Sequence, residues 1–152
     1  MKALHACLWA LYILTAAAIL TTSNSFQSNL AADALGIILL VGGGWFMVWA
    51  KYWLGRQYER LPKIKEGHVL IMNGPYAMLR HPEYFGMAAA FLGLSLVLKS
   101  YVGLVVWLAA LVPIHAYLAF KEERLLEKHF KQQHKEYKQR VGLLPKIKGK
   151  GA

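Results

Sequence analysis

Four long apolar stretches, separated by polar segments, constrain this chain more than any other feature of its sequence. A helix that crosses the ~30 Å hydrocarbon core of a bilayer needs roughly 20 apolar residues. Three stretches approach that length, at 3–22, 34–54 and 101–120. A fourth, at 84–98, is shorter and suits one arm of a tight helical hairpin. The sequence therefore predicts an all-α integral membrane protein with about four transmembrane helices.

Two of these stretches carry features of their own. The last contains Pro113, which predicts a kink, and His115 as its one ionisable group. We interpret His115 as a hydrogen-bonded core residue and predict no metal site. The first stretch contains Thr15 and three alanines, a pattern that also fits the cleavage site of a signal peptide. Because the apolar run continues through Ile19 and Leu20, we expect a retained helix.

The charge of the chain is strongly positive, and its distribution predicts an orientation. There are 18 Lys+Arg against 8 Asp+Glu, a formal net charge of +10. In a soluble protein this excess would suggest nucleic acid, but 57% of the residues are hydrophobic and they lie in blocks. We therefore predict membrane lipids, and no nucleic acid, as partners. Lys99 is the only basic residue in a segment expected outside, so both termini and the loop 51–83 are predicted to be cytoplasmic.

The remaining composition narrows location and organisation. Cys7 is alone, which excludes a disulfide framework and cysteine-based zinc sites. The small size and the lack of a recognisable retention signal favour the plasma membrane of a prokaryote. We divide the chain into a two-span membrane region (1–66), a catalytic region made of a helical hairpin and a tail helix (67–145), and a disordered basic tail (146–152).

The segment after Phe120 mixes charged and apolar residues at helical spacing. Leu126, Phe130 and Tyr137 are predicted to share one face, directed at the protein or at the membrane surface. This segment is expected to form a cytoplasmic C-terminal helix.

Polar residues that could carry chemistry gather on the predicted cytoplasmic side. Asn-Gly-Pro at 73–75 is a turn signal, and Pro82 suits the first position of a helix. Each feature has a structural explanation, since Arg80 can be a topology anchor and Tyr84 part of an interfacial aromatic belt. The pair Glu122-Glu123 at a membrane boundary requires cationic partners, and Arg80, Arg124 and the positive groups of a bound ligand are the candidate partners of Glu122.

Taken together, these motifs have a familiar order and spacing. The motifs are His68-Val-Leu, Gly74-Pro75-Tyr76, Arg80-His81-Pro82-x-Tyr84-x-Gly86, Glu122-Glu123-x-x-Leu126-x-x-x-Phe130 and Glu136-Tyr137. The set resembles the isoprenylcysteine carboxyl methyltransferase family, which belongs with the phospholipid N-methyltransferases in a wider group of membrane methyltransferases. The resemblance covers about residues 67–145.

The resemblance implies a site for S-adenosylmethionine at the cytoplasmic ends of the last two spans and the tail helix. Two segments and one carboxylate match its cofactor-binding positions, and no catalytic residue is assigned. The matching positions are His68, Val69, Leu70, Ile71, Tyr76, His81, Pro82, Glu83, Tyr84 and Glu122. A carboxylate and aromatic faces are suited to hold the cationic sulfonium of this cofactor.

The chain departs from the family on the acceptor side. An arginine that the family carries one turn before the glutamate pair is Leu118 here, and the tail has Lys131 and His134 where the family has Phe-Gly and Tyr. The sequence therefore predicts methyl transfer to a lipophilic small molecule or lipid, with a carboxylate, an amine or a thiol as the acceptor.

Three alternatives stay open beside this prediction. The chain could be a phospholipid-type N-methyltransferase, in which case His115, His134 or Tyr117 could help to keep an amine unprotonated. It could be a nicotinamide-dependent membrane reductase, because sterol reductases share a related C-terminal arrangement, although the short chain and the glutamate pair argue against this. It could also be a non-enzymatic protein that binds lipid.

Overall fold

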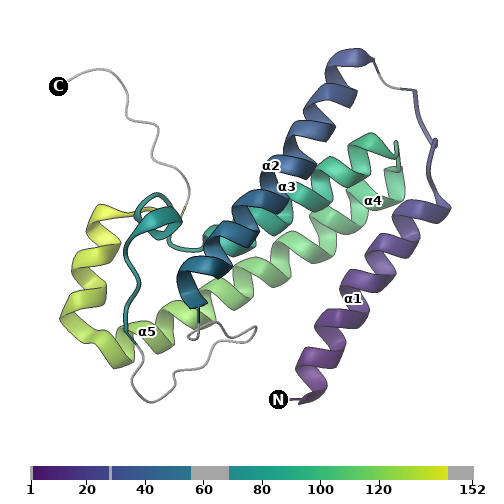
Figure 1. Ribbon diagram of the computed structural model, residues 1–152. Coiled ribbons are helices and arrows are strands. Elements are labelled where there is room, and N and C mark those ends of the chain that lie inside the picture. Colours follow the sequence, from purple (N-terminus) through teal and green to yellow (C-terminus); the bar gives the residue numbers. More distant parts are fainter. Residues whose placement is uncertain (1, 28, 56–68, 144–152) are drawn as a thin grey trace.

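The apolar stretches form a bundle of helices. The computed structural model describes residues 2–27, 29–55 and 69–143, and within these ranges it contains helices and no strands. The elements are α1 (Lys2–Thr21), α2 (Leu30–Leu54), the short 3-10 helix η2 (Gly74–Ala77), α3 (Pro82–Val97), α4 (Tyr101–Val106), the π-helical segment η3 (Trp107–Leu111) and α5 (Val112–Arg140). The last three follow one another as one helix that is continuous up to Lys131, where the chain turns sharply before it ends at Arg140 (Figure 1).

The prediction of an all-α chain with long apolar helices is confirmed. Two helices, Leu30–Leu54 and Tyr101–Arg140, are long and apolar enough to cross a membrane. The apolar helices Ala6–Thr21 and Pro82–Val97 are shorter. The tail 146–152 and much of the loop 51–83 lie outside the described residues.

Helices α2 and α3 form an antiparallel pair whose backbones approach closely. Gly43 packs against Gly86, and Gly36 packs against Gly93. A Cβ atom at Gly43 would lie 2.6 Å from the carbonyl oxygen of Gly86, which is closer than real side chains come. Small residues of this kind let helix backbones approach closely in membranes. Close packing matters there because the hydrophobic effect does not drive helices together in lipid. Of this pair, α3 lies against α4, η3 and α5 (Figure 1).

Helix α1 packs along the continuous α4–α5 helix. Leu8 and Leu118 are both about 1% exposed and pack against each other. Near the opposite end of α1, Thr22 Oγ1 lies 2.6 Å from Ser100 Oγ. Ser100 also caps α4, because its Oγ accepts a hydrogen bond from the backbone N–H of Gly103 at 3.0 Å. The first stretch is therefore part of the bundle core.

The long C-terminal helix is irregular at two points. A π-helical turn at Trp107–Leu111 lies just before Pro113, where the sequence predicts a kink, and the α-helix continues after it. At Lys131 the backbone adopts φ 45 and ψ −110, and the chain turns back sharply (Figure 1). Leu126, Phe130 and Tyr137 do meet in one cluster, with Leu70 and Val141. The prediction that these three residues share a face directed at the protein agrees with this cluster, although the turn at Lys131 separates Phe130 from Tyr137.

The close α2–α3 approach generates a stability prediction. Gly93→Ala should lower the free energy of unfolding by roughly 1–3 kcal/mol, because its Cβ would meet the Gly36 carbonyl oxygen at 2.6 Å and the backbone nitrogen of Leu40. Gly42→Ala is the matched control, since a Cβ there meets nothing within 4 Å. Denaturant unfolding of the detergent-solubilised variants, followed by circular dichroism, measures both. Equal effects of the two substitutions would contradict this packing.

Candidate functional site

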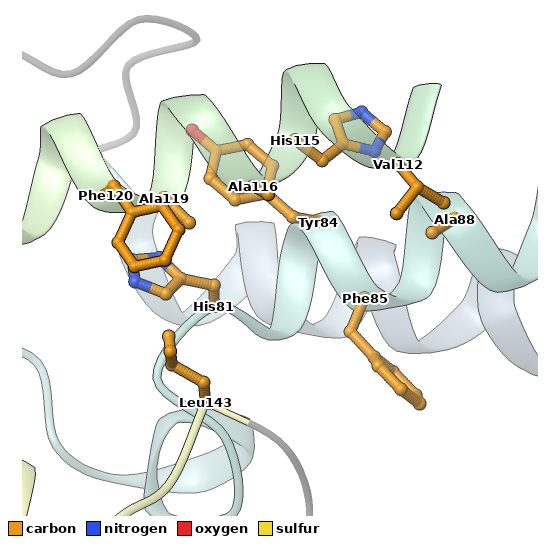
Figure 2. A pocket seen from close by; sticks show the side chains of 10 residues that line it. All are labelled: His81, Tyr84, Phe85, Ala88, Val112, His115, Ala116, Ala119, Phe120 and Leu143. Carbon is orange, nitrogen blue, oxygen red and sulfur yellow. The ribbon is translucent and has the colours of Figure 1, made fainter. Parts of the chain in front are cut away.

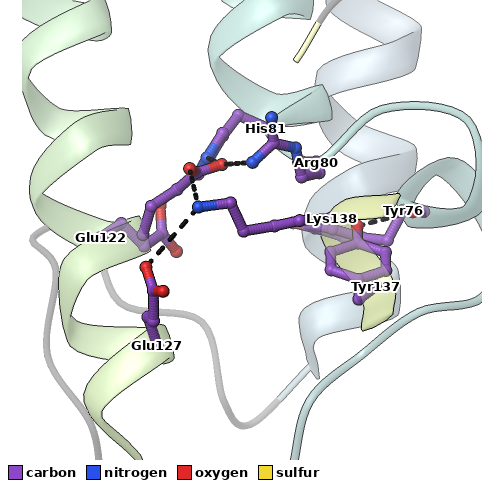
Figure 3. Close-up of polar contacts among 8 residues, drawn as sticks. Tyr76, Arg80, His81, Glu122, Glu127, Tyr137 and Lys138 are labelled. Atoms are coloured by element: carbon purple, nitrogen blue, oxygen red, sulfur yellow. Dashed lines mark hydrogen bonds and ion pairs between the residues drawn. The ribbon is translucent and has the colours of Figure 1, made fainter. Parts of the chain in front are cut away.

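The polar motifs converge where α3 begins, against the middle of α5. His81 is the residue before α3, and Pro82 occupies the first turn, where a missing N–H removes no helical hydrogen bond. The short helix η2 and the Asn73 turn lead into this point. On the other side, Glu122 and Glu123 lie in α5. The turned-back end of α5 closes the arrangement from a third direction (Figure 3).

Glu123 is the centre of a network of ion pairs. Its side chain is buried, with only 7% of the residue exposed. Oε1 accepts a hydrogen bond from Arg80 Nη1 and lies 3.3 Å from His81 Nε2. Oε2 lies 3.7 Å from Lys138 Nζ, which is also 3.6 Å from Glu127 Oε2 (Figure 3). The sequence indicated Arg80 as a partner for Glu122, whereas the structure pairs Arg80 with Glu123.

His81 bridges the two neighbouring glutamates. Its Nδ1 lies 3.3 Å from Glu122 Oε2, while its Nε2 faces Glu123 Oε1. Burial by itself lowers the pKa of His81, but the hydrogen bonds and charges of Glu122 and Glu123 outweigh it and raise the pKa above its ordinary value. With a carboxylate at each nitrogen, the imidazolium form is favoured, because both nitrogens then donate.

The same contacts set the charge of Glu123. Burial alone would raise the pKa of this carboxyl group, but the hydrogen bond from His81 and the charges of Arg80, His81 and Lys138 hold the pKa below its usual value. Glu123 therefore stays ionised. These cationic partners compensate the buried charge of Glu123. Removal of one partner would leave part of that charge uncompensated.

The chain after the reversal at Lys131 is attached by specific contacts. Tyr137 Oη donates a hydrogen bond to the backbone oxygen of Tyr76 at 2.7 Å, and burial raises the pKa of its phenol. The Arg80 backbone N–H donates to the Gly142 oxygen at 3.1 Å. His134 is buried beside Tyr137, and this burial lowers the pKa of its imidazole.

An apolar pocket of about 340 Å³ lies directly beside the charged network. It is lined by α3, α5 and the end of the C-terminal segment (Figure 2): His81, Tyr84, Phe85, Ala88, Val112, His115, Ala116, Ala119, Phe120 and Leu143. The rings of His81 and Tyr84 stack with centroids 5.8 Å apart, and those of Tyr84 and His115 stack at 5.6 Å. The stacked rings connect the charged network to the interior of the pocket.

The structure brings some of the predicted cofactor residues together and separates others. His81, Tyr84 and Glu122 meet at the junction of network and pocket. Leu70 and Tyr76 lie in the neighbouring cluster around Tyr137. The rest occupy other positions: Val69 is 58% exposed, Ile71 is half-buried, Pro82 is buried in the first turn of α3, Glu83 pairs with Lys51 of α2 at 3.5 Å, and His68 lies outside the described residues.

Several residues of the site were not assigned a role from the sequence. Lys138 reaches Glu123 only because the chain reverses at Lys131, and no sequence pattern indicated that turn. Phe85 and Leu143 line the pocket without belonging to any motif we used. The sequence did single out His115, because it is the one ionisable group of the last apolar stretch. Its interpretation as a hydrogen-bonded core residue agrees with its contact to Tyr12 Oη, 3.0 Å from Nε2.

No group of three or more His, Cys, Asp or Glu residues suited to a metal ion occurs in the part of the chain that the structure describes. Two carboxylates of the charged network are partly exposed: the side chain of Glu122 is 35% exposed and that of Glu127 is 42% exposed.

Comparisons with known proteins identify the family to which the chain belongs. The model of the phospholipid methyltransferase family matches residues 31–133, more than half of the chain. The chain belongs to this family of membrane methyltransferases, and the resemblance predicted from its motifs is confirmed.

Two curated relatives are more specific. Protein-S-isoprenylcysteine O-methyltransferase of Saccharomyces cerevisiae is 30% identical over 111 residues, which are 72% of this chain and 46% of the relative. Protein-S-isoprenylcysteine O-methyltransferase B of Arabidopsis thaliana is 32% identical over 89 residues, 57% of this chain and 45% of the relative. The chain thus spans slightly less than half the length of these relatives. No solved structure gives a significant match.

The shifted pKa values of His81 and Glu123 predict how stability depends on pH. Glu123, whose pKa is lowered, contributes fully above its ordinary value of 4.5 and less as the pH falls below that value. His81, whose pKa is raised, contributes fully below its ordinary value of 6.5 and less as the pH rises above that value. The contribution of the pair to the free energy of unfolding should therefore be greatest between pH 4.5 and 6.5.

Substitution isolates each side of this pH dependence. His81→Gln should remove the decline above pH 6.5, which one proton limits to about 1.4 kcal/mol per pH unit. Glu123→Gln should reduce the decline on the acid side. Denaturant unfolding of the three proteins between pH 4 and about 9 measures this. An alkaline decline that is identical in the native chain and in His81→Gln would contradict the assignment.

Proposed function

We propose that this chain transfers a methyl group from S-adenosylmethionine to a lipophilic small molecule or lipid in the membrane. The observation that carries the proposal is the junction at His81, Tyr84 and Glu122, where a charged network meets an apolar pocket. A polar cationic cofactor and a lipophilic acceptor require two such environments side by side. Membership of a methyltransferase family supports the same reaction.

The donor set at the junction fits this cofactor. The carboxylate of Glu122 is partly exposed and forms an ion pair with His81. Its exposed side can also face the sulfonium or the amino group of the cofactor. The faces of Tyr84 and His81 offer stacking surfaces, and a π-face also attracts a cation. When bound, S-adenosylmethionine supplies an electrophilic methyl group. Pro82 and Glu83 support the start of α3 in this proposal, while Leu70 and Tyr76 hold the neighbouring wall.

The residues of the chain contribute mainly position and environment. Paired carboxylates on both nitrogens fix the ring of His81, and His81 in turn stacks on Tyr84. The apolar lining of the pocket offers a lipophilic acceptor a surface with few polar groups. Methyl transfer is an in-line displacement, so alignment of the two reactants supplies much of the acceleration.

The acceptor is less defined than the cofactor. Leu118 is about 1% exposed and packs on Leu8, so the position where the resembled family carries an arginine is filled by an apolar contact. A carboxylate acceptor therefore lacks that cation here, and an amine or thiol acceptor fits as well, as in a phospholipid-type N-methyltransferase. The family match weighs against a nicotinamide-dependent reductase and against a protein that only binds lipid.

Calorimetry with S-adenosylhomocysteine tests the cofactor proposal. Glu122→Gln should weaken binding by about tenfold or more, because it removes the charge from a partly exposed carboxylate at the junction. Tyr84→Phe should weaken it less, and His81→Ala should weaken it while also loosening the glutamate network. Glu127→Gln is the matched control, because Glu127 is nearby but contacts only Lys138 among the ion pairs of the described residues. Equal affinities of Glu122→Gln and Glu127→Gln would contradict the proposed role of Glu122.

We also propose that the chain crosses the plasma membrane of a prokaryote four times, with both termini in the cytoplasm. Lys51, Arg80 and Lys121 lie at one end of the helices, whereas Lys99 pairs with Asp33 at the other. This uneven distribution of basic residues supports the proposed orientation, because cytoplasmic loops of membrane proteins carry an excess of Lys and Arg.

Reporter fusions test the topology. A reporter active only outside the cytoplasm should be silent when fused after Ala152 and active when inserted after Asn24, because these positions lie on opposite sides in the four-span arrangement. Activity of the fusion after Ala152 would exclude this arrangement.

A further inference from the structure

His115 has a buried ring nitrogen that the rest of the structure does not use. The residue is 4% exposed, and its Nε2 lies 3.0 Å from Tyr12 Oη of α1. Its other nitrogen, Nδ1, has no hydrogen-bond partner among the residues that the structure describes. Buried polar atoms are nearly always paired, so an unpaired one calls for a ligand or another specific explanation.

This nitrogen belongs to a residue that lines the apolar pocket. His115 stacks on Tyr84, and Tyr84 stacks on His81 (Figure 2). His115 is therefore two rings away from the charged network where we place the cofactor. The π-helical turn at Trp107–Leu111 lies directly before this part of α5 and shifts the helical register there. Such turns occur frequently at functional sites.

The chemistry of the pocket limits what can occupy it. Among the residues that the structure describes, its lining is apolar apart from the two histidines and the hydroxyl of Tyr84, and none of these lining residues is Lys, Arg, Asp or Glu. His81 is already engaged by both glutamates. An ion placed deep in such a pocket would lose its hydration without gaining a counter-ion. A neutral molecule with an apolar body and a single hydrogen-bonding group fits instead.

We propose that His115 Nδ1 anchors the methyl acceptor by a hydrogen bond, and that this acceptor is a neutral lipophilic molecule with a hydroxyl, thiol or uncharged amine group. The inference rests on the proposed function and adds a substrate class and an acceptor-anchoring residue to it. A neutral imidazole offers one donor and one acceptor nitrogen. Tyr12 Oη can donate or accept, so it can hold the ring in the tautomer that the ligand requires.

The test uses two variants that each keep one polar position of the ring. The amide of His115→Asn lies near the position of Nδ1, and that of His115→Gln lies near the position of Nε2, which faces Tyr12. The probe is dodecanol, measured by its ability to displace a diazirine-bearing dodecanol from the detergent-solubilised protein, with labelled peptides identified by mass spectrometry. Dodecanethiol, dodecane and dodecanoate are compared with it. S-adenosylhomocysteine binding is measured on every protein.

The native chain should bind dodecanol and dodecanethiol about fivefold more tightly than dodecane, which is the effect of one hydrogen bond. It should bind dodecanoate more weakly than dodecanol or dodecanethiol. His115→Asn should keep most of that preference and His115→Gln should lose it. Equal preferences in the native chain and both variants, the reverse order of the variants, or a preference for dodecanoate would overturn the inference. The native measurements need no substitution, so they decide it even if the variants do not fold.

The two proposals fail in different ways. If the native chain binds S-adenosylhomocysteine but shows no preference for dodecanol over dodecane, the acceptor class is wrong and the proposed function stands. If it does not bind S-adenosylhomocysteine, the proposed function is wrong.

Discussion

The buried carboxylate of Glu123 is the interaction on which the rest of the site depends. It requires cationic partners, and it obtains them from Arg80 and His81 before α3 and from Lys138 after the chain reversal. Breaking one member of a buried ion pair typically costs about 3–5 kcal/mol, because the other charge remains buried. One carboxylate therefore fixes three chain segments relative to one another. The beginning of α3, with Pro82 and the stacked rings that follow, is oriented by the same contacts.

The continuity of α5 converts this anchor into a site with two environments. His115 and Glu123 lie on the same helix, eight residues or about 12 Å apart along its axis. The part of α5 around Glu123 belongs to the glutamate network, and the part around His115 lines an apolar pocket. Because the helix runs without interruption between them, the distance between the polar and apolar parts is fixed by helix geometry. A reaction that joins a polar donor to a lipophilic acceptor needs this constant separation.

Much of the architecture could be predicted from the sequence, because apolar length and turn chemistry are local properties. The first three long helices begin and end within a few residues of the expected stretches, and Pro82 opens α3 as expected. The last begins at Tyr101 as expected but runs on past Phe120 into the predicted tail helix. The sequence could not predict the reversal at Lys131, since a lysine with φ 45 is held by tertiary contacts such as those of Tyr137 and Lys138. The division of roles between Glu122 and Glu123 was also not predictable. Adjacent residues on a helix point in different directions, and only the packed structure shows that Glu123 is buried.

The packing of α1 explains why the acceptor side differs from the resembled family. Leu8 packs on Leu118, and one turn further along each helix Tyr12 contacts His115. A charged side chain at 118 would have to be buried where Leu118 now packs on Leu8, which costs desolvation energy. One turn away, the same face of α5 instead carries the ring of His115. The hydroxyl of Tyr12 in α1 fixes the orientation of this ring. In our proposal, replacement of a cation by a neutral ring changes the preferred ligand from an anion to a neutral polar group. Helix α1, which carries none of the recognised motifs, would then take part in determining what the pocket accepts.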